Sequence, residues 1–415
     1  MNLSEDLAWR GLIKDKTFES DKWLDKPRKF YLGIDASSDS LTIGNLAVIM
    51  LARRLAEAGW AAVLLAGGAT SLVGDPGGKD EERNLKAKAE IAKNIDGVEG
   101  QIEKLFAGQK HQMVNNLDWL GELKYLDFLR DVGKHYPMSE LMQREFVNAR
   151  MNESGSGISY AEFSYSLLQG YDFWWLFNNK GVEMQIGASD QWGNILSGVA
   201  LIRKKEAKEV HALCMPLVIN KATGKKFGKS ESGAIWLDAK RTSPYRFYQF
   251  WYNIADDEVA DHLKVFTLIK HEEFEPLIKQ QAAKPAERIA QKKLAYEVTA
   301  LVHGNDQAKK QEHIAQALFG GGDVSELNDS ELATVREELP SAKVQPGTPV
   351  IEVLVKTGLA SSNSEARRLA QSQAVYVDNQ SFNKDHLEAN DFKRGRLLLR
   401  RGKAYKDSAL VELAQ

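Results

Sequence analysis

The sequence is poor in features that several large classes of protein require. Its single cysteine, Cys214, excludes a disulfide framework or a cysteine-based zinc site within one chain. No run of apolar residues approaches the roughly 18 that a membrane-spanning helix needs. The first residues, MNLSEDLAWRGLIKDK, also lack the apolar core of a signal peptide. We therefore expect a soluble protein that works in the cytoplasm without a membrane partner.

A dominant charge of one sign is also missing. The chain has 55 Lys and Arg against 57 Asp and Glu, a net charge of −2 at pH 7. The balance is uneven, because 341–415 holds 12 basic and 8 acidic residues, a net of +4 that leaves −6 for the rest. A basic end on an acidic body favours an anionic partner, such as a nucleic acid, bound at that end.

Two familiar nucleotide-binding motifs are absent. A phosphate-binding loop needs Gly, four residues and then Gly-Lys-Ser/Thr, but VGDPGGKD has Val73 at the first position and Asp80 after Lys79. No G-x-G-x-x-G lies at a strand–helix junction. No Ser-His-Asp set, cysteine nucleophile or metal-ligand cluster is apparent, and all eight histidines lie at or after His111. The common ATPase and dinucleotide-binding classes are therefore excluded.

The pattern of apolar residues predicts the fold class. Alternating apolar residues over 30–34 predict a strand, and apolar residues spaced by three and four over 48–58 predict a helix. The run AAVLLAGG predicts a second, buried strand. Buried strands that alternate with helices indicate an α/β fold with a parallel sheet. Ligands of such sheets bind at the carboxyl ends of the strands, where Asp35 and Gly187 fall.

The second part of the chain has a different pattern. From about Thr242 to Phe319 the sequence is charged and helical, and GGGD and PSAKVQPGTP then indicate a linker. A compact unit follows, in which Ser362 and Glu365 match a capping box at the start of a helix. Strand and turn patterns after it complete a small α+β module.

Two segments are candidate phosphate sites. In DASSDSLTIGNL, 35–46, a strand meets a helix whose first N–H groups favour anions, and Gly44 would let a flat base lie against the backbone. In KKFGKSES, Lys226 and Lys229 on a glycine-containing loop could bring two ammonium groups to a polyphosphate. Taken singly, Gly44 could merely begin an ordinary helix, and the lysines could be a solvated loop.

Set together, these segments resemble tyrosyl-tRNA synthetase of the bacterial type, a class I aminoacyl-tRNA synthetase. DSLTIGNL stands where the family has its His-Ile-Gly-His box, and KFGKS stands at its Lys-Met-Ser-Lys-Ser box. Further segments follow the family's order: GGATSLVGDPGGKDEERN, FLRDVGKHY, ISYAEFSYSLLQGYDF, QIGASDQWGNI and SGAIWLDAKRTSPYRFYQFWYN. The tail resembles the RNA-binding module of ribosomal protein S-four.

The resemblance implies a Rossmann-like parallel-sheet catalytic domain, an α-helical domain and a small α+β RNA-binding module. We expect the catalytic domain, with a dimerisation insertion, over 1–240 and a helical domain that binds the tRNA anticodon over 241–320. A linker over 321–349 would lead to the S-four-like module over 350–415. The family works as a homodimer, and we expect the same here.

The resemblance also implies a tyrosine site. Tyr31 and Asp172 would hold the phenol, Tyr165 and Gln169 would lie around the substrate amino group, and Asp75 and Gln191 would support them. Tyr165, Gln169 and Asp172 are spaced i, i+4 and i+7, one face of a helix, although an ordinary core helix could show the same stripe.

The ATP site implied by the resemblance uses residues from both boxes. The residues implied to bind ATP are Asp35, Gly44, Asn45, Gly187, Asp190, Lys226 and Lys229. Catalysis falls to Ser37, Thr42, Asn45, Lys79, Arg83, Lys226 and Lys229, where Ser37 and Thr42 would contact the γ-phosphate and the others would hold adenosine or grip pyrophosphate. Lys79 and Arg83 could instead belong to a solvated loop.

Three positions depart from the family pattern. Thr42 replaces the first histidine of the box, Asn45 replaces the second, and Ala188 replaces a glycine beside the ribose. The amide of Asn45 can donate as an imidazole N–H would. The loss of one charge-assisted phosphate contact at Thr42 costs about 1.5–3 kcal/mol, which slows an enzyme without abolishing its activity.

The expected reaction is a ligation in two steps. L-tyrosine and ATP give tyrosyl-adenylate and pyrophosphate, and tyrosine then passes to the 3′-terminal ribose of tRNA(Tyr). Attack on the α-phosphate needs only positioning and charge neutralisation, with Mg²⁺ carried on ATP and no protein metal site. Two alternatives stay open: an RNA-binding or regulatory paralogue that lost catalysis at Thr42, and a ligase for another amino acid such as tryptophan.

Overall fold

The structure, a computed structural model, describes most of the chain. The described residues are 1–75, 86–143, 147, 158–221, 223–224, 226–230, 233–320, 322–402 and 407–414, with the backbone alone at 229–230. They form two compact units. The first comprises Met1–Thr242 and Ile254–Ala290, and the second comprises Ser243–Asn253 and Gln291–Gln415.

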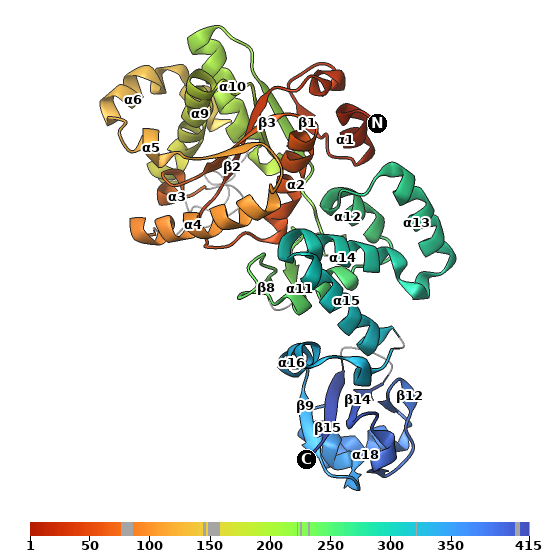
Figure 1. The fold of residues 1–415 in the computed structure, drawn as a ribbon. Helices are drawn as coiled ribbons and strands as arrows, with labels where there is room; N and C mark the ends of the chain where they lie inside the picture. The colour runs from red at the N-terminus through yellow and green to blue at the C-terminus, as the bar shows by residue number, and fades with distance from the viewer. Residues whose placement is uncertain are drawn as a thin grey trace. The chain divides into compact units, whose positions relative to one another are not determined.

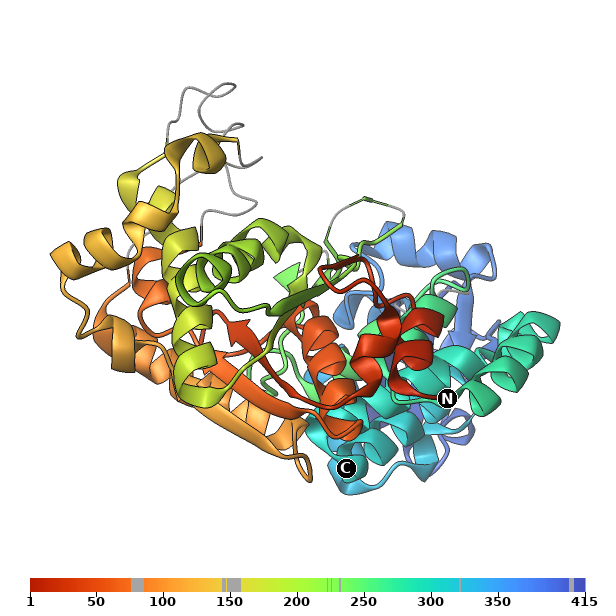
Figure 2. The same ribbon diagram turned by 90° about the horizontal axis from the view of Figure 1, so that it is seen from above.

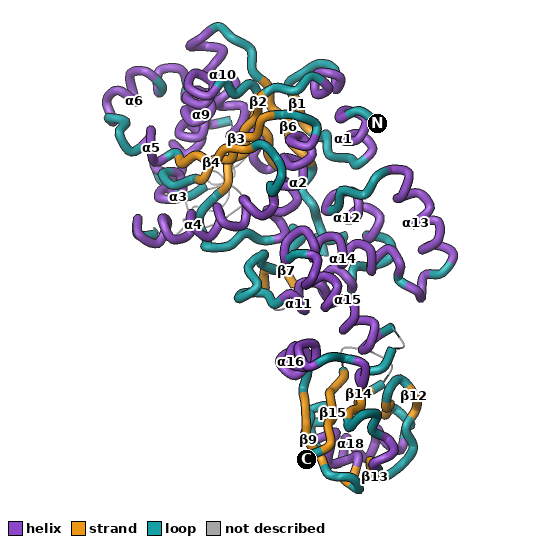
Figure 3. The backbone as a smooth tube through the Cα atoms, in the orientation of Figure 1, coloured by secondary structure: helices purple, strands orange, loops and turns teal. Residues whose placement is uncertain are grey.

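The first unit is built on a six-stranded sheet of order β1-β6-β5-β2-β3-β4 (Figures 1 and 3). Five strands are parallel and the short edge strand β1 is antiparallel. Their bounds are Asp15–Lys16 (β1), Lys29–Ile34 (β2), Ala61–Ala66 (β3), His111–Asn115 (β4), Met184–Ala188 (β5) and His211–Met215 (β6). The predicted α/β fold with a parallel sheet is confirmed.

The order of the strands fixes where a ligand can enter. From β2 the chain moves outward to β3 and β4, and it then returns to β5 on the other side of β2. In such open sheets a crevice forms at the carboxyl ends of the two strands where the order reverses. Here those strands are β2 and β5, paired with Tyr31 opposite Gln185 and Leu32 opposite Ile186.

Helices carry residues to that crevice. α2 (Ile43–Glu57) follows β2, while α9 (Tyr160–Lys180) precedes β5 and α10 (Trp192–Glu206) follows it. α9 begins at a capping box of Ser159 and Glu162 and ends at Gly181 in the left-handed conformation. α9 and α10 lie side by side in both ribbon views (Figures 1 and 2). A Cβ at Gly198 would lie 2.6 Å from Cβ of Phe173, so glycine permits this close packing.

The first unit contains further helices among the described residues. They are α1 (Leu3–Trp9), α3 (Thr70–Val73), α4 (Lys88–Leu105), α5 (Leu117–Leu120), α6 (Tyr125–Asp131), α7 (Met138–Met142), α12 (Val259–Phe266) and α13 (His271–Ala283), with a small ribbon of β7 (Lys229–Ser230) and β8 (Gly233–Ala234). Among the described residues, no helix is long and apolar enough to cross a membrane.

The second unit combines helices with a separate sheet. Its helices are α11 (Pro244–Tyr252), most of α14 (Ile289–His303), α15 (Asn305–Phe319), α16 (Asp329–Glu338), α17 (Val350–Lys356) and α18 (Asn363–Gln371). A five-stranded sheet has the order β12-β11-β14-β15-β9, with bounds Gln380–Ser381, Val375–Val377, Arg396–Arg401, Ser408–Leu413 and Ser341–Val344; β10 (Thr348–Pro349) pairs with β13 (His386–Leu387). The predicted α+β module is present, and the helices predicted over 241–320 are present but divided between the two units.

The segment predicted as a linker, 321–349, contains regular structure. α16 lies within it, capped by Asn328 and Glu331, and β9 joins the C-terminal sheet parallel to β15. Ala342 and Val344 of β9 belong to the core of this module, so the sheet begins before residue 350. A strand of only four residues, with prolines and a glycine close by, shows too short a pattern to be predicted from the sequence.

Candidate active site

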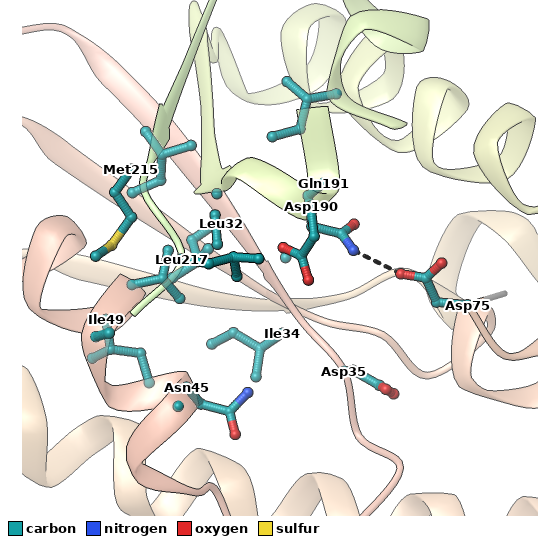
Figure 4. Close-up of a pocket in the computed structure, with 18 of the residues that line it drawn as sticks. Leu32, Ile34, Asp35, Asn45, Ile49, Asp75, Asp190, Gln191, Met215 and Leu217 are labelled. Carbon is teal, nitrogen blue, oxygen red and sulfur yellow. Dashed lines mark hydrogen bonds between the residues drawn. The ribbon is translucent and has the colours of Figure 1, made fainter. Parts of the chain in front are cut away.

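A cavity of about 530 Å³ opens at the carboxyl ends of β2 and β5 (Figure 4). It collects side chains that lie far apart in the sequence. Of the predicted site residues, its lining includes Tyr31, Asp35, Thr42, Gly44, Asn45, Asp75, Tyr165, Gln169, Asp172, Gly187, Asp190, Gln191 and Lys226, and it also includes Ala188. These predicted tyrosine and ATP residues therefore share one cavity.

Four predicted residues are not among the described residues that line the cavity. Ser37 does not line the cavity; its backbone N–H donates to Oδ1 of Asp35 over 3.0 Å. Lys79 and Arg83 lie outside the described residues. Lys229 lies in β7, described by its backbone only. For these lysine and arginine side chains the predicted roles stay predictions.

A buried carboxylate and a buried phenol both line the cavity and interact electrostatically. Asp172 of α9 and Tyr31 of β2 are 2% and 1% exposed. Nε1 of Trp119 donates to Oδ1 of Asp172 over 2.7 Å, and Nδ2 of Asn116 donates to Oδ2 over 3.0 Å. The hydroxyl of Tyr31 has no hydrogen-bond partner among the described residues. A buried hydroxyl without a partner is costly, so this end of the cavity is built to receive a polar group.

Burial dominates the electrostatics of this pair. It raises the pKa of Asp172 to about 7, although the bonds from Asn116 and Trp119 oppose the shift. Burial, followed by the charge of Asp172, raises the pKa of Tyr31 well above its usual range. Tyr31 thus stays a hydroxyl at neutral pH, and Asp172 is poised between its acid and its anion.

Asn116 and Trp119 were missed in the sequence, although they hold the central carboxylate. They follow β4, whose carboxyl end lies at the same edge of the sheet. Asn116 is fully buried, its Oδ1 accepts from the N–H of Ala69, and its Nδ2 also donates to Thr70. The one available signal would have been a polar residue directly after a strand, but β4 itself was not predicted from the sequence.

A second polar group in the cavity lies around Asp75. Nε2 of Gln191 donates to Oδ2 of Asp75 over 2.8 Å (Figure 4), and Oε1 of Gln191 accepts from Asn194 over 3.2 Å. Tyr165 and Gln169 reach the same cavity from α9, as their helical spacing predicted. A carboxylate held by one amide, in a cavity that a second amide and a phenol also line, suits a cationic amino group.

The two predicted phosphate segments meet at the start of α2. The N–H of Ile43 donates to the carbonyl of Ile235, whose own N–H donates to the carbonyl of Gly228. A Cβ at Gly228 would lie 2.9 Å from Cγ1 of Ile43 and 3.3 Å from the N of Gly44. A Cβ at Gly44 would make only ordinary contacts with the protein, so internal packing does not demand that glycine, which faces the cavity.

One ion pair bridges this part of the cavity. Nζ of Lys226 lies 2.8 Å from Oδ2 of Asp190, and both side chains are partly exposed. Asp190 follows β5, where Gly187 is buried and Ala188 has ordinary extended backbone, φ −92° and ψ 161°. Such an exposed pair contributes at most about 1 kcal/mol, so a ligand can separate it at little cost.

Comparisons with known proteins agree with this geometry. The family described as "tRNA synthetases class I (W and Y)" matches residues 24–320, and the "Tyrosine--tRNA ligase SYY-like C-terminal domain" matches 331–406. The tyrosine–tRNA ligase of Streptomyces avermitilis is 44% identical over 99% of both chains, and that of Roseiflexus castenholzii is 43% identical over 90% of both.

A solved structure extends the likeness to the fold. The C-terminally truncated mitochondrial tyrosyl-tRNA synthetase of Aspergillus nidulans matches with a TM-score of 0.70 and 31% identity, and the match covers 77% of this chain and 94% of that one. The resemblance predicted from the sequence is confirmed. The chain therefore belongs to the class I tRNA synthetases of the tryptophan and tyrosine family and, within it, to the tyrosine–tRNA ligases.

Proposed function

We propose that this chain activates L-tyrosine with ATP to give tyrosyl-adenylate and pyrophosphate, and then transfers tyrosine to the 3′-terminal ribose of tRNA(Tyr). The pair of Asp172 and Tyr31 carries the proposal. A substrate phenol between them donates to the carboxylate and accepts from the hydroxyl of Tyr31, which otherwise has no partner among the described residues. A substrate without that hydroxyl is rejected because the buried hydroxyl of Tyr31 stays unpaired and Asp172 loses one donor, a rule of which tyrosyl-tRNA synthetases are themselves a standard example.

The other end of tyrosine is assigned to the group around Asp75. In this proposal the ammonium of tyrosine contacts Asp75, Tyr165 and Gln169, while Gln191 holds the carboxylate of Asp75 in place. The substrate carboxylate is then directed toward the start of α2, where Gly44 and Asn45 receive adenosine. Attack on the α-phosphate becomes a reaction between two bound partners, which removes much of its entropic cost.

The segment KKFGKSES, called the lysine segment below, neutralises negative charge during this step. Asp190 binds the ribose hydroxyls, and Lys226 leaves it for the phosphates as ATP enters. Lys229, Lys79 and Arg83 complete the group that acts on pyrophosphate. Mg²⁺ arrives on ATP and supplies further positive charge to the phosphates; among the described residues, no group of three or more His, Cys, Asp or Glu could hold a metal ion.

Exchange of labelled pyrophosphate into ATP tests the activation step. We expect exchange that depends on tyrosine and is near background with phenylalanine or tryptophan. Exchange driven by tryptophan would assign the chain to the other amino acid of this family. Folded protein that shows no exchange with any amino acid would favour the non-catalytic paralogue.

We also infer a homodimer, from apolar side chains that stay exposed in one segment. They are Leu117, Tyr125, Leu126, Leu129, Met138, Met142 and Tyr160, with Leu126 76% exposed. All lie from the start of α5 to the start of α9, within the predicted catalytic domain, for which a dimerisation insertion was expected. Large exposed apolar patches on one segment are typical of protein interfaces, and a two-fold dimer would bury this one against its own copy.

The second unit is assigned to tRNA. The helical domain predicted over 241–320, of which Ile254–Ala290 belongs to the first unit, would bind the anticodon. The module predicted over 350–415 would bind RNA through its excess of basic residues. Because the tyrosine–tRNA ligases of Streptomyces avermitilis and Roseiflexus castenholzii are bacterial proteins, we propose that the enzyme works in the cytoplasm.

A further inference from the structure

Thr42 and Asn45, which replace the two histidines of the family's box, form a pair that was not predicted. Thr42 directly precedes α2 with extended backbone, φ −108° and ψ 169°. Two of its groups meet one atom, Oδ1 of Asn45. The backbone N–H of Thr42 donates to it over 2.9 Å and the hydroxyl over 2.8 Å. Both residues line the cavity.

These contacts commit the only proton of the Thr42 hydroxyl. A threonine hydroxyl carries one proton, and here it goes to Asn45. Phosphate oxygens of ATP accept hydrogen bonds, so Thr42 cannot also donate to them while the pair is intact. The direct contact between Thr42 and the γ-phosphate that the resemblance implied is therefore incompatible with this pair.

The same contacts determine how the amide of Asn45 is turned. A backbone N–H can only donate, so the atom that it meets must be the carbonyl oxygen of the amide and not its nitrogen. With Oδ1 held by Thr42, the two N–H bonds of Nδ2 are left for other partners. Figure 4 shows the amide nitrogen of Asn45 turned toward Ile34 in the lining of the cavity.

We propose that Thr42 is a positioning residue, which fixes the amide of Asn45 so that Nδ2 donates to the adenosine part of ATP. Thr42 itself touches no phosphate. This inference rests on the proposed function and adds the route by which Thr42 acts in it. It also explains how the box works without histidine, because a neutral pair supplies one donor that is held in a single orientation.

A double-mutant cycle tests the route. Thr42→Val keeps the shape of the side chain and removes its hydroxyl, and Asn45→Ala removes the amide. Single-turnover rates of tyrosyl-adenylate formation and the KM for ATP are measured for both variants and their combination. Because the backbone N–H of Thr42 still reaches Asn45, we expect Thr42→Val to lower the rate about 3–10-fold alone, and less than about twofold in the Asn45→Ala background. Equal losses in both backgrounds would overturn the proposal.

Two conservative variants guard against a loss that is only structural. Thr42→Ser keeps the hydroxyl, and we expect its rate within about threefold of wild type. Asn45→Asp keeps an oxygen for Thr42 but has no N–H, so it should melt close to wild type and lose at least as much rate as Asn45→Ala. A faster Asn45→Asp, or a Thr42→Ser as slow as Thr42→Val, would contradict the proposal.

The activity of the wild-type protein in the same assay tells failure of the positioning role of Thr42 apart from failure of the proposed function. Active wild type with no coupling between Thr42 and Asn45 overturns the positioning role and leaves the proposed function standing. Folded wild type that forms no tyrosyl-adenylate overturns both.

Discussion

At the residue scale, the ionisation of Asp172 should control tyrosine binding. The hydrogen bond from a substrate phenol to Asp172 is much stronger when that carboxyl group is ionised, and burial raises the pKa of Asp172 to about 7. About one molecule in ten is then ionised at pH 6 and about nine in ten at pH 8. We expect the Kd of tyrosine, measured by equilibrium dialysis without ATP, to be about tenfold higher at pH 6 than at pH 8.

Asp172→Asn is the matched variant for this prediction. It should weaken tyrosine binding by at least about 2 kcal/mol and remove the dependence on pH, because no carboxylate remains. A variant that keeps the wild-type pH profile would assign the titration to another group. The raised pKa of Asp172 also makes the free energy of unfolding of the ligand-free protein fall as pH rises. The stabilisation that comes from protonated Asp172 is fully present below the pKa of this group in the unfolded chain, near 4, and it is lost as pH rises through the folded-state pKa of about 7.

The residues of this pocket show how far sequence reasoning reaches. Tyr165, Gln169 and Asp172 were placed on one helix face because helical spacing is a local property. Asn116 and Trp119 have no such spacing to Asp172, which is more than 50 residues away in the chain. The order of the strands in the sheet brings them together, so only the structure identifies them.

At the element scale, the contact between the lysine segment and α2 depends on Gly228. Its φ of +105° disfavours any side chain, and a Cβ there would also lie 2.9 Å from Ile43. Gly228→Ala should therefore displace the segment that carries Lys226, with a local cost of about 1–3 kcal/mol. We expect the single-turnover rate of adenylate formation to fall more than about tenfold, while the Kd of tyrosine changes little.

Gly224→Ala is the control for this element. Gly224 also has a positive φ, +65°, but no atom lies within 4 Å of its Cβ position. It tests backbone strain without the contact to α2, and we expect a clearly smaller loss of rate. Equal losses for the two variants would mean that strain alone, and not packing on α2, explains the effect.

Elements differ in how well the sequence predicts them. β2, β3 and α2 have enough residues for their apolar period to be recognised, and the structure contains all three. β9 has four residues, and its place in the sheet comes from pairing with β15, the last strand of the chain. A short strand stabilised by a distant partner leaves little pattern in its own sequence.

At the scale of the whole molecule, the first prediction concerns the homodimer. Leu126→Glu places a charge in the exposed apolar segment, and two-fold symmetry would place it there twice. We expect the dimer dissociation constant, measured by sedimentation velocity, to rise at least about 100-fold. Lys208→Glu, at an exposed position outside this segment, should leave it nearly unchanged. A wild-type protein that sediments as a monomer at micromolar concentration would refute the inference.

The last prediction is that the C-terminal module affects only the transfer of tyrosine to tRNA, and not the activation of tyrosine in the cavity. Arg367 and Arg368 lie exposed on α18 in the basic C-terminal module, far in sequence from every residue of the cavity. If they contact tRNA phosphates, the double variant Arg367→Glu/Arg368→Glu should raise the KM for tRNA at least about tenfold. A plot of the logarithm of the tRNA binding constant against the logarithm of the salt concentration should become less steep, with a slope smaller in magnitude by about one to two. Tyrosine-dependent pyrophosphate exchange should stay at the wild-type rate, because that step does not involve tRNA. A parallel loss of exchange would show that the substitutions disturb the fold, and an unchanged KM for tRNA would remove α18 from the RNA-binding surface.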